Sequence, residues 1–519
     1  MHVFWQTLVG IFLLIFLCNT DAYKILVVYP LPVRSLDILG NGIVKHLLKD
    51  GHEVTYMSNY VLNIPESKKF RQITITGNKL CDDESFSIGY ILDNKMQQSN
   101  AAHMQEFAKD GARIFFENEN VTNFLAKTDE QFDAVVSDWF ESEVYAGLSV
   151  LYNCPMLWEY SMGAHWQVLR LISDTGNPAY DSNYLGTNVP PFSFLQRVEE
   201  LAGRFNWIFA KRFLTMPGER EIYERTFKPL LAKRGRELPE YEDVIYNASM
   251  IFGNEHHAII GRPNTPQNFK YIGGFHVDEP IIPLPKNLQD LMDNAPHGVI
   301  YFSMGSFWKT KMLPMSLTRA LLDLFAELKQ TVIWKYEDDL KDLPKNVHIV
   351  HWAPQQSILA HDNCKFFISH GGLLSSLESI YFGVPVIGIP VMFDQYINII
   401  KAVFNGYAIH VDLSYDLPQN LKAAIDVMMK DDTNRVKEMS AIYHDRLTKP
   451  GAELVHWIKH VIRTRGALHL RSPALNSPLY QRLYLDLIAL IIAIVYIFYA
   501  ILCRILKRCN KNVTDKKNN

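Results

Sequence analysis

The stretch from Trp352 to Gln395 reads WAPQQSILAHDNCKFFISHGGLLSSLESIYFGVPVIGIPVMFDQ. Within it, Cys364–Ser369 is a short apolar run that predicts a buried strand. His370-Gly371-Gly372 follows this run and predicts a break after the strand. Apolar residues at helical spacing then follow from Leu373 to Phe382, and Gly383 is placed to cap the helix at its C-terminus. The stretch therefore predicts a strand that turns sharply into a helix.

The break between that strand and helix suits an anion. A second apolar run, Val384–Pro390, predicts a further buried strand, so the break belongs to a parallel sheet. The first N–H groups of a helix have no intrahelical partner, and the helix dipole favours negative charge there. Gly371 and Gly372 allow a phosphate to approach the backbone closely, and His370 adds a side-chain donor.

Other polar and aromatic groups flank the expected phosphate site. Glu378 lies in the helix, and Asp394-Gln395 follows the next strand. Carboxylates and amides at such positions are suited to binding sugar hydroxyls, and Trp352 offers a flat face for a base. A nucleotide-sugar matches these groups from end to end.

The order of these motifs resembles the signature of the UDP-glycosyltransferases, the family that includes the UDP-glucuronosyltransferases. The motifs are W-x-P-Q, H-G-G, a Glu eight residues after the His, G-V-P and D-Q. The resemblance extends from about Tyr23 to the C-terminal anchor, and GGLLSSLES and HLRSPAL are similar to invertebrate members. It implies an α/β fold of GT-B type, in which two Rossmann-like doubly wound domains face a cleft.

The resemblance also implies a role for each donor-site residue. Trp352 would stack on uracil with Gln355 beside it, and Glu378 would bind the ribose hydroxyls. Two further groups are implied: a diphosphate site of Arg262, Ser306, His370, Gly371 and Gly372, and a hexose site of Asp394 and Gln395. No metal and no cofactor is implied, because the UDP-sugar is a co-substrate.

One catalytic position departs from the family pattern. Family members carry a histidine early in the first helix as general base, oriented by an acidic residue after a later strand. Asp138, which follows the predicted strand Phe132–Ser137, matches the acidic residue, whereas Leu36 stands at the histidine position. Leucine cannot accept a proton, and a positioned general base contributes roughly 100- to 10,000-fold to the rate.

This departure leaves three hypotheses open. The enzyme could prefer amines or acceptors that are already acidic. Asp37 could substitute as the base. Alternatively, the chain could be a membrane-anchored protein of the same fold that binds a UDP-sugar or small ligand without turnover.

The 519 residues exceed what one hydrophobic core usually holds, so more than one domain is expected. The run KILVVY at 24–29 and the helical spacing after it predict a βαβ unit that opens the first domain. This unit lacks G-x-G-x-x-G, which argues against a nicotinamide or flavin site. The expected order is a signal peptide (1–22), an acceptor-binding domain (23–277), a linker (278–296), a UDP-sugar-binding domain (297–450), a helix with a juxtamembrane segment (451–483), a transmembrane helix (484–503) and a cytosolic tail (504–519).

Membrane topology follows from the two ends of the chain. The uncharged run Leu8–Cys18 is typical of a secretory signal, and Leu487–Cys503 is long enough to span a bilayer. Basic residues follow that span, so the tail is expected in the cytosol. The ending Lys-Lys-Asn-Asn resembles a retrieval signal, which predicts a single-pass type I protein of the endoplasmic reticulum. Sequons at Asn120 and Asn247 are then lumenal and predict a glycoprotein.

Composition limits the partners. The net charge of −3 gives no reason to propose nucleic acid. Three cysteines between the leader and the anchor are too few for a disulfide framework. We expect a small lipophilic acceptor and a role in detoxification, and invertebrate members favour UDP-glucose over UDP-glucuronate. The sequence leaves the oligomeric state open, and a homo-oligomer is one possibility.

Overall fold

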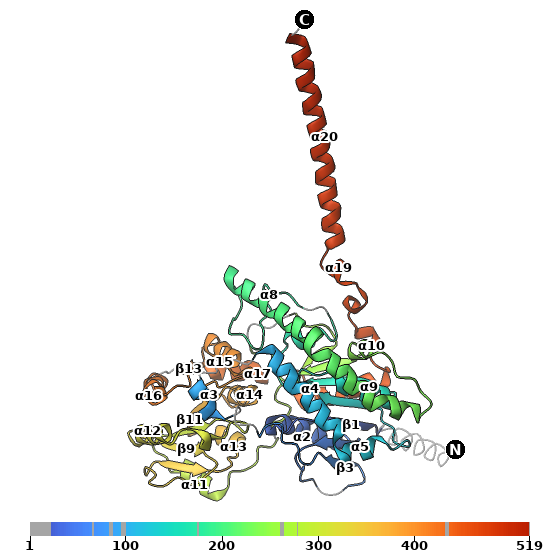
Figure 1. Ribbon diagram of the computed structural model, residues 1–519. Helices are drawn as coiled ribbons and strands as arrows, with labels where there is room; N and C mark the ends of the chain where they lie inside the picture. The colour runs from blue at the N-terminus through green and yellow to red at the C-terminus, as the bar shows by residue number, and fades with distance from the viewer. Residues whose placement is uncertain are drawn as a thin grey trace, which may run out of the picture. The chain divides into compact units, whose positions relative to one another are not determined.

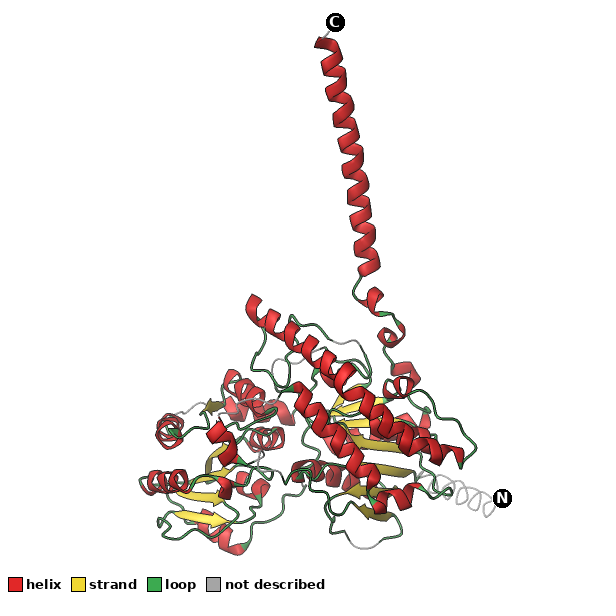
Figure 2. Ribbon diagram, in the orientation of Figure 1, coloured by secondary structure: helices red, strands yellow, loops and turns green. Residues whose placement is uncertain are grey.

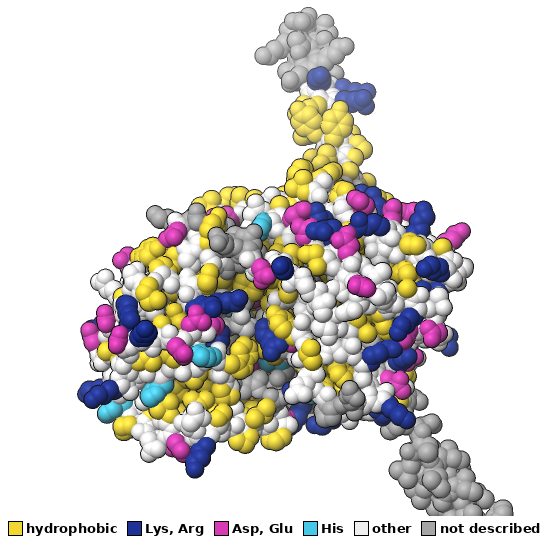
Figure 3. All heavy atoms as spheres, turned by 60° about the horizontal axis from the view of Figure 1, so that its bottom comes forward, with side chains coloured by type: hydrophobic (Ala, Val, Ile, Leu, Met, Phe, Trp, Pro, Cys, Tyr) yellow, Lys and Arg dark blue, Asp and Glu magenta, His cyan; other side chains and the backbone are white. Residues whose placement is uncertain are grey.

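A computed structural model describes residues 22–64, 67–82, 87–94, 100–173, 176–259, 264–277, 279–430 and 435–517 (Figure 1). The predicted signal segment and Arg262 lie outside these residues. The chain divides after Arg471 into a large first unit and a short second unit. Charged side chains of both signs are scattered over the face in Figure 3.

The first unit contains two parallel sheets (Figure 2). The first sheet has seven strands in the order β3-β2-β1-β4-β5-β6-β7. Its order reverses between β1 and β4, and in such sheets ligands bind at the carboxyl ends of the strands beside this point. The strand bounds are β1 (Lys24–Tyr29), β2 (Glu53–Ser58), β3 (Phe70–Thr74), β4 (Ala134–Asp138), β5 (Met156–Tyr160), β6 (Met250–Gly253) and β7 (Phe269–Tyr271).

Helices cover both faces of this sheet, as its continuous apolar strands require. The segment β1–α2–β2 is the βαβ unit that the sequence predicts. The helix bounds are α2 (Arg34–Lys49), α4 (Ala101–Glu117), α5 (Glu119–Leu125), α6 (Gly147–Tyr152), α7 (Trp166–Leu169), α8 (Phe194–Phe209), the π-helical turn η3 (Ala210–Thr215), α9 (Met216–Ala232) and α10 (Tyr241–Ile245).

The second sheet has six strands in the order β10-β9-β8-β11-β12-β13, with its reversal between β8 and β11. The short helix α3 (Ile88–Asn94) comes from the first part of the chain but packs in the core of this sheet. The strand bounds are β8 (Val299–Ser303), β9 (Thr331–Lys335), β10 (Val347–Val350), β11 (Cys364–Ser369), β12 (Val386–Gly388) and β13 (Ala408–His410).

The helices around the second sheet end with one that returns to the first. Helix α18 packs against α2, where Gly451 is required because a Cβ there would lie 2.0 Å from the His46 ring. The bounds are α11 (Lys286–Asp293), α12 (Met315–Ala326), α13 (Gln355–Leu359), α14 (Leu373–Phe382), α15 (Gln395–Phe404), α16 (Leu417–Met428), α17 (Arg435–His444) and α18 (Pro450–Arg463).

The stretch that opened the sequence analysis folds largely as predicted. The strand Cys364–Ser369 and the helix Leu373–Phe382 have the expected bounds, and Gly383 caps that helix in the left-handed conformation at φ 69°. The strand predicted at Val384–Pro390 is shorter, spanning Val386–Gly388. Prolines flank those three residues, and proline has no N–H to donate to a ladder.

The second unit consists mainly of helix α20 (Leu485–Lys517), which follows the short helix α19 (Leu479–Arg482). The segment Leu485–Arg508 is long and apolar enough to cross a bilayer, and none of its most apolar window is buried. This helix fits the membrane anchor that the sequence predicts.

Candidate active site

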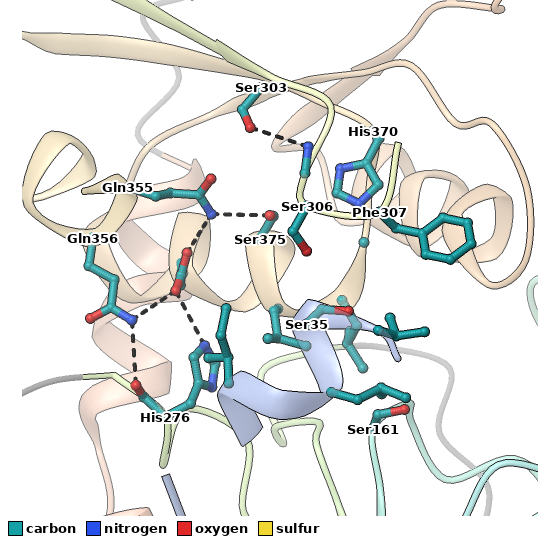
Figure 4. Close-up of a pocket in the computed structure, with 18 of the residues that line it drawn as sticks. Ser35, Ser161, His276, Ser303, Ser306, Phe307, Gln355, Gln356, His370 and Ser375 are labelled. Atoms are coloured by element: carbon teal, nitrogen blue, oxygen red, sulfur yellow. Dashed lines mark hydrogen bonds and ion pairs between the residues drawn. The ribbon is translucent and has the colours of Figure 1, made fainter. Parts of the chain in front are cut away.

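A cavity of about 440 Å³ lies at the carboxyl ends of strands from both sheets. From the first sheet, the segments after β1 and β5 contribute lining residues, which include Leu36 and Ser161. From the second sheet, the segments after β8, β11 and β12 contribute others, and Figure 4 shows several of these side chains converging. Both switch points therefore open into one space, where ligands of such sheets bind.

His370 lies at the predicted phosphate position and is held in a tight slot. A Cβ on Gly305 would lie 2.4 Å from its ring, and a Cβ on Gly372 would lie 2.6 Å from it. Burial, together with the charge of Lys335, lowers the pKa of His370 to about 4. The imidazole is therefore neutral at physiological pH and has one N–H to donate.

Gly371 lies behind the turn that precedes α14. It does not line the cavity, and its backbone N–H donates to Ser369 Oγ at 3.2 Å. Its φ of 81° and its close approach to Ile399 instead shape the turn into α14. Ser306 and Gly372 do line the cavity.

Lys335 brings a cation to the same end of the cavity. This side chain ends β9 and is buried, and its Nζ donates to Gly305 O at 2.8 Å and to Glu337 Oε1 at 2.6 Å. It lines the cavity near His370. The sequence reasoning missed it, although a lysine at the carboxyl end of a buried strand is a signal for a functional group.

Glu378 is buried among polar groups that fix its carboxylate. Gln355 Nε2 donates to Glu378 Oε2 at 2.5 Å, and Gln356 Nε2 donates to Oε1 at 2.9 Å. His276 Nε2 lies 3.4 Å from Oε1 (Figure 4). Tyr301 OH in turn donates to Gln355 Oε1 at 3.2 Å. The structure thus adds Gln356 and His276 to the predicted pair, because both line the cavity beside Glu378.

Trp352 lies at the rim of the cavity and is 58% exposed. The guanidinium of Arg34 lies 5.8 Å from its ring centroid, and so does the ammonium of Lys335. An exposed indole face with neighbouring cations can stack on a planar, electron-rich group.

Asp394 and Gln395 begin α15 and line the cavity. Asn398 Nδ2 donates to Asp394 Oδ2 at 2.7 Å, and burial raises the pKa of Asp394 to about 6. Gln395 Oε1 accepts from the backbone N–H groups of Val391 and Met392. The amide nitrogen of Gln395 is therefore the atom of this side chain that can donate a hydrogen bond to a ligand oxygen.

The opposite end of the cavity is mainly apolar. Leu36 is buried there at the start of α2, and its side chain lines the cavity. Asn41, Lys45 and Ser161 are polar groups on this side. The apolar lining on this side includes Val33, Leu36, Ile38, Phe107, Phe140, Met162 and Leu374.

Asp138 is fully buried at the end of β4 and does not line the cavity. Neither of its carboxylate oxygens has a hydrogen-bond partner among the described residues. Burial raises the pKa of Asp138 to about 8. Tyr29 and Asp138 end the adjacent strands β1 and β4, and Leu36 packs in the same core as Tyr29. A buried carboxyl without a partner is what loss of a partnering histidine would leave.

Asp37 is turned away from the cavity. Tyr56 OH donates to Asp37 Oδ1 at 2.9 Å, and Asn41 Nδ2 donates to Oδ2 at 3.1 Å. Arg34 lies 3.6 Å from the same carboxylate. Because Asp37 does not line the cavity, this geometry argues against the hypothesis that it replaces the histidine as base.

The two predicted glycosylation sites lie on the surface of the first unit. Asn120 is exposed in α5, where its Nδ2 donates to Thr74 O at 2.9 Å. Asn247 is exposed just after α10, outside any helix or strand.

Two parallel sheets that share one cavity at their switch points form an architecture of the GT-B class. The family model described as "UDP-glucoronosyl and UDP-glucosyl transferase" matches residues 25–519, and the chain belongs to this family. It is 30% identical to UDP-glucosyltransferase 2 of Dactylopius coccus over 485 aligned residues. The alignment covers 92% of this chain and 91% of that relative. It is 26% identical over 477 residues to human UDP-glucuronosyltransferase 2B10, with 87% of each chain covered.

Solved structures show the same fold at low sequence identity. The calicheamicin glycosyltransferase CalG4 superposes with a TM-score of 0.54 at 17% identity, over 86% of this chain and 100% of that one. A UDP-glucosyltransferase from Polygonum tinctorium superposes with a TM-score of 0.54 at 14% identity, over 86% of this chain and 99% of that one.

Proposed function

We propose that this UDP-glycosyltransferase transfers a hexose from a UDP-sugar to a small lipophilic acceptor, with inversion at the anomeric carbon. The observation that carries this proposal is the cavity of about 440 Å³, which is polar and partly charged beside α14 and α15 and apolar beside α2. Such a division suits a charged donor at one end and an apolar acceptor at the other.

The UDP-sugar fits the polar end of the cavity in one orientation, with uracil at Trp352 and the hexose at Asp394 and Gln395. Uracil stacks on Trp352, and the ribose hydroxyls bind the carboxylate of Glu378, which two glutamines already orient. The diphosphate then reaches Ser306, the N-terminus of α14 and His370. The hexose lies beside Asp394 and Gln395, whose carboxylate and amide suit sugar hydroxyls.

The departing UDP gains negative charge as the sugar–oxygen bond breaks. Neutral His370 donates one hydrogen bond to this charge, and the ammonium of Lys335, which is paired with Glu337, lies nearby. Such fixed donors stabilise the transition state because they are already oriented toward the developing charge. The acceptor attacks from the face opposite UDP, so the configuration inverts.

The acceptor preference follows from Leu36. An amine has a free lone pair and needs no proton acceptor before it attacks. A phenol of low pKa is already ionised in part, whereas an alcohol depends on the missing base. We therefore expect amines and acidic phenols to be glycosylated faster than alcohols.

The test is release of UDP by the full-length protein in nanodiscs, with an arylamine, an acidic phenol or an alcohol as acceptor. We expect UDP-glucose to support faster release than UDP-glucuronate. Val427→Ser, an exposed position on α16, serves as the control variant and should keep full activity. The proposal fails if no acceptor class increases UDP release above the rate without acceptor.

That failure would favour the second candidate, a membrane-anchored protein that binds UDP-sugars or small ligands without turnover. Leu36 is the observation in its favour. The two assays together identify the second candidate, because it would bind the UDP-sugar in calorimetry but release no UDP with any acceptor.

We further propose that the protein resides in the endoplasmic reticulum membrane with its first unit in the lumen. The apolar helix α20 and the basic residues after its span support this orientation. Glycosylation of lipophilic compounds at such a membrane would serve detoxification.

A further inference from the structure

Helix α8 and the π-helical turn η3 bury charged side chains and expose apolar ones. Along one face, Glu200, Arg204 and Lys211 are at most 6% exposed, and Trp207 is 1% exposed. These positions recur at helical spacing, so they form one inner stripe. The usual arrangement of a surface helix is the reverse, with its charges in water.

Specific contacts fix this orientation. Glu200 Oε2 accepts from the backbone N–H of Asn183 at 2.8 Å, and Arg204 donates to Gly176 O at 2.8 Å. Lys211 Nζ lies 2.7 Å from Glu143 and 2.8 Å from Glu219. Leaving a buried charge without its partner is strongly destabilising, so α8 is not free to rotate its apolar face inward.

The outer face is mainly apolar, and the exposed polar residues of α8 include Glu199 and Asn206. From Phe194 to Leu214 it spans about 30 Å at the rise of a helix. Figure 1 shows α8 as a long helix on the outside of the first unit. The exposed side chains, with their exposed fractions, are Phe194 (70%), Leu195 (70%), Val198 (48%), Leu201 (42%), Phe205 (65%), Ile208 (39%), Phe209 (57%), Phe213 (64%) and Leu214 (58%).

A contiguous apolar surface of this kind marks a contact with a partner or a membrane. The position of the membrane span in the chain favours a membrane over a partner protein. Residues 472–484 join the first unit to the span that begins at Leu485. Thirteen residues reach at most about 45 Å, so the first unit is always held close to a bilayer.

The polar residues on the edges of this face also suit a bilayer surface. Arg197 and Arg212 are exposed, and the guanidinium of Arg197 lies 5.8 Å from the centroid of the Phe194 ring. Arginine beside an apolar face can extend its charge to the lipid headgroups while its stem stays among acyl chains. An amphipathic helix of this type lies in the plane of the interface, buried by about 5–10 Å.

We propose that the exposed face of α8 and η3 lies in the surface of the bilayer that holds α20. The protein then has two membrane contacts, a spanning helix and a helix lying in the interface. This inference uses no residue of the cavity and does not depend on the proposed reaction.

The test uses the full-length protein, one copy per nanodisc, with phosphatidylcholine that carries a photoreactive diazirine in its acyl chain. After illumination, mass spectrometry maps the lipid adducts. We expect adducts on peptides from 194–214 as well as on α20, and none on the peptide from α16 that contains the exposed Val427. Adducts confined to α20 would overturn the proposal.

Two matched variants complete the test. Replacing Phe205, Phe209 and Phe213 with serine should abolish the adducts on 194–214 and leave those on α20. Replacing Phe404, Val427 and Ile442 with serine, which are similarly exposed elsewhere, should change neither. If differently tagged copies instead co-purify from detergent, and the first variant abolishes this, a second copy covers the face and the proposal is wrong.

Discussion

At the residue scale, Leu36 and Asp138 carry the proposed departure from base catalysis. Leu36 lines the cavity and has no group that accepts a proton, and Asp138 is buried without a hydrogen-bond partner among the described residues. The raised pKa of Asp138, to about 8, means that the carboxyl is mostly protonated at neutral pH. A neutral acid is tolerated in this core where a lone carboxylate would not be.

Restoring the histidine tests this interpretation. In Leu36→His, we expect turnover on alcohols and weakly acidic phenols to rise by up to about 100- to 10,000-fold, the range of a general base. Turnover on amines should change little. Leu36→Asn, which adds polarity without a base, is the control and should give no gain. Efficient transfer to alcohols by the unmodified protein, with no gain in Leu36→His, would contradict the prediction.

A second prediction concerns Asp138 and stability. Its folded-state pKa is raised above the ordinary value of about 3.9. The unfolded chain therefore releases the proton at lower pH than the folded chain, and stability falls as pH rises from about 4 to 8. In Asp138→Asn this loss disappears. We expect the Tm of the variant, minus the Tm of the wild type, to increase steadily from pH 5 to pH 8. A difference in Tm that does not depend on pH would refute the burial argument.

Asp394 gives a third prediction, on the pH dependence of donor binding. Burial raises its pKa to about 6, so the carboxylate that accepts from sugar hydroxyls is lost as pH falls through 6. We expect the affinity for the UDP-sugar, measured by calorimetry, to fall between pH 7 and pH 5. Asp394→Asn should bind about tenfold more weakly at pH 7 and lose this pH dependence, since a hydrogen bond to a charged group contributes roughly 1.5–3 kcal/mol. Asp412→Asn, an exposed position, should retain it.

At the scale of elements, the turn from β11 into α14 was the most predictable part of the protein. A short apolar run, two glycines and a helical repeat are local signals, and they set the bounds of both elements. The position of Glu378 in the cavity follows from the same signals. His276 was missed because it reaches the cavity from a distant segment, and no local pattern encodes that contact. Gln356 directly follows Gln355, and Lys335 ends a buried strand, so local signals for these two residues were present but were not used.

Packing between distant elements was also beyond the sequence pattern. Helix α3 belongs to the first part of the chain, yet Ile88 and Ile91 pack with Ile300 in the core of the second sheet. Helix α11 lies within the range predicted as a linker, and its Leu288 and Met292 pack beside β8. The apolar residues of these short helices do not indicate which sheet they will cover.

The slot around His370 offers a test at this scale. A Cβ on Gly372 would lie 2.6 Å from the His370 ring, so Gly372→Ala forces the imidazole to move. The φ of Gly372 is −60°, which alanine adopts without strain. We therefore expect Gly372→Ala to fold with a nearly unchanged Tm but to lose most of its turnover. Gly203→Ala, where a Cβ would lie 3.3 Å from the nearest atom, the side-chain nitrogen of Asn183, controls for the loss of a glycine. Equal activity in both variants would contradict a role for the slot around His370.

At the scale of the whole molecule, the proposed topology predicts the pattern of glycosylation. Asn120 and Asn247 lie on the surface of the first unit, and Asn512 follows the span Leu485–Arg508. Glycan mapping of the protein from insect cells should find sugar on one or both of the first two and none on Asn512. A glycan on Asn512 would mean that the tail is lumenal.

The most direct measurement is the anomeric configuration of the product, determined by proton NMR after incubation of the full-length protein with UDP-glucose and an acidic phenol. UDP-glucose is an α-glycoside, so attack from the face opposite UDP yields a β-linked aryl glucoside together with free UDP. We expect this product, and we expect Glu378→Ala to form it much more slowly at limiting donor concentration. An α-linked product, or UDP release that yields only free glucose, would contradict the mechanism.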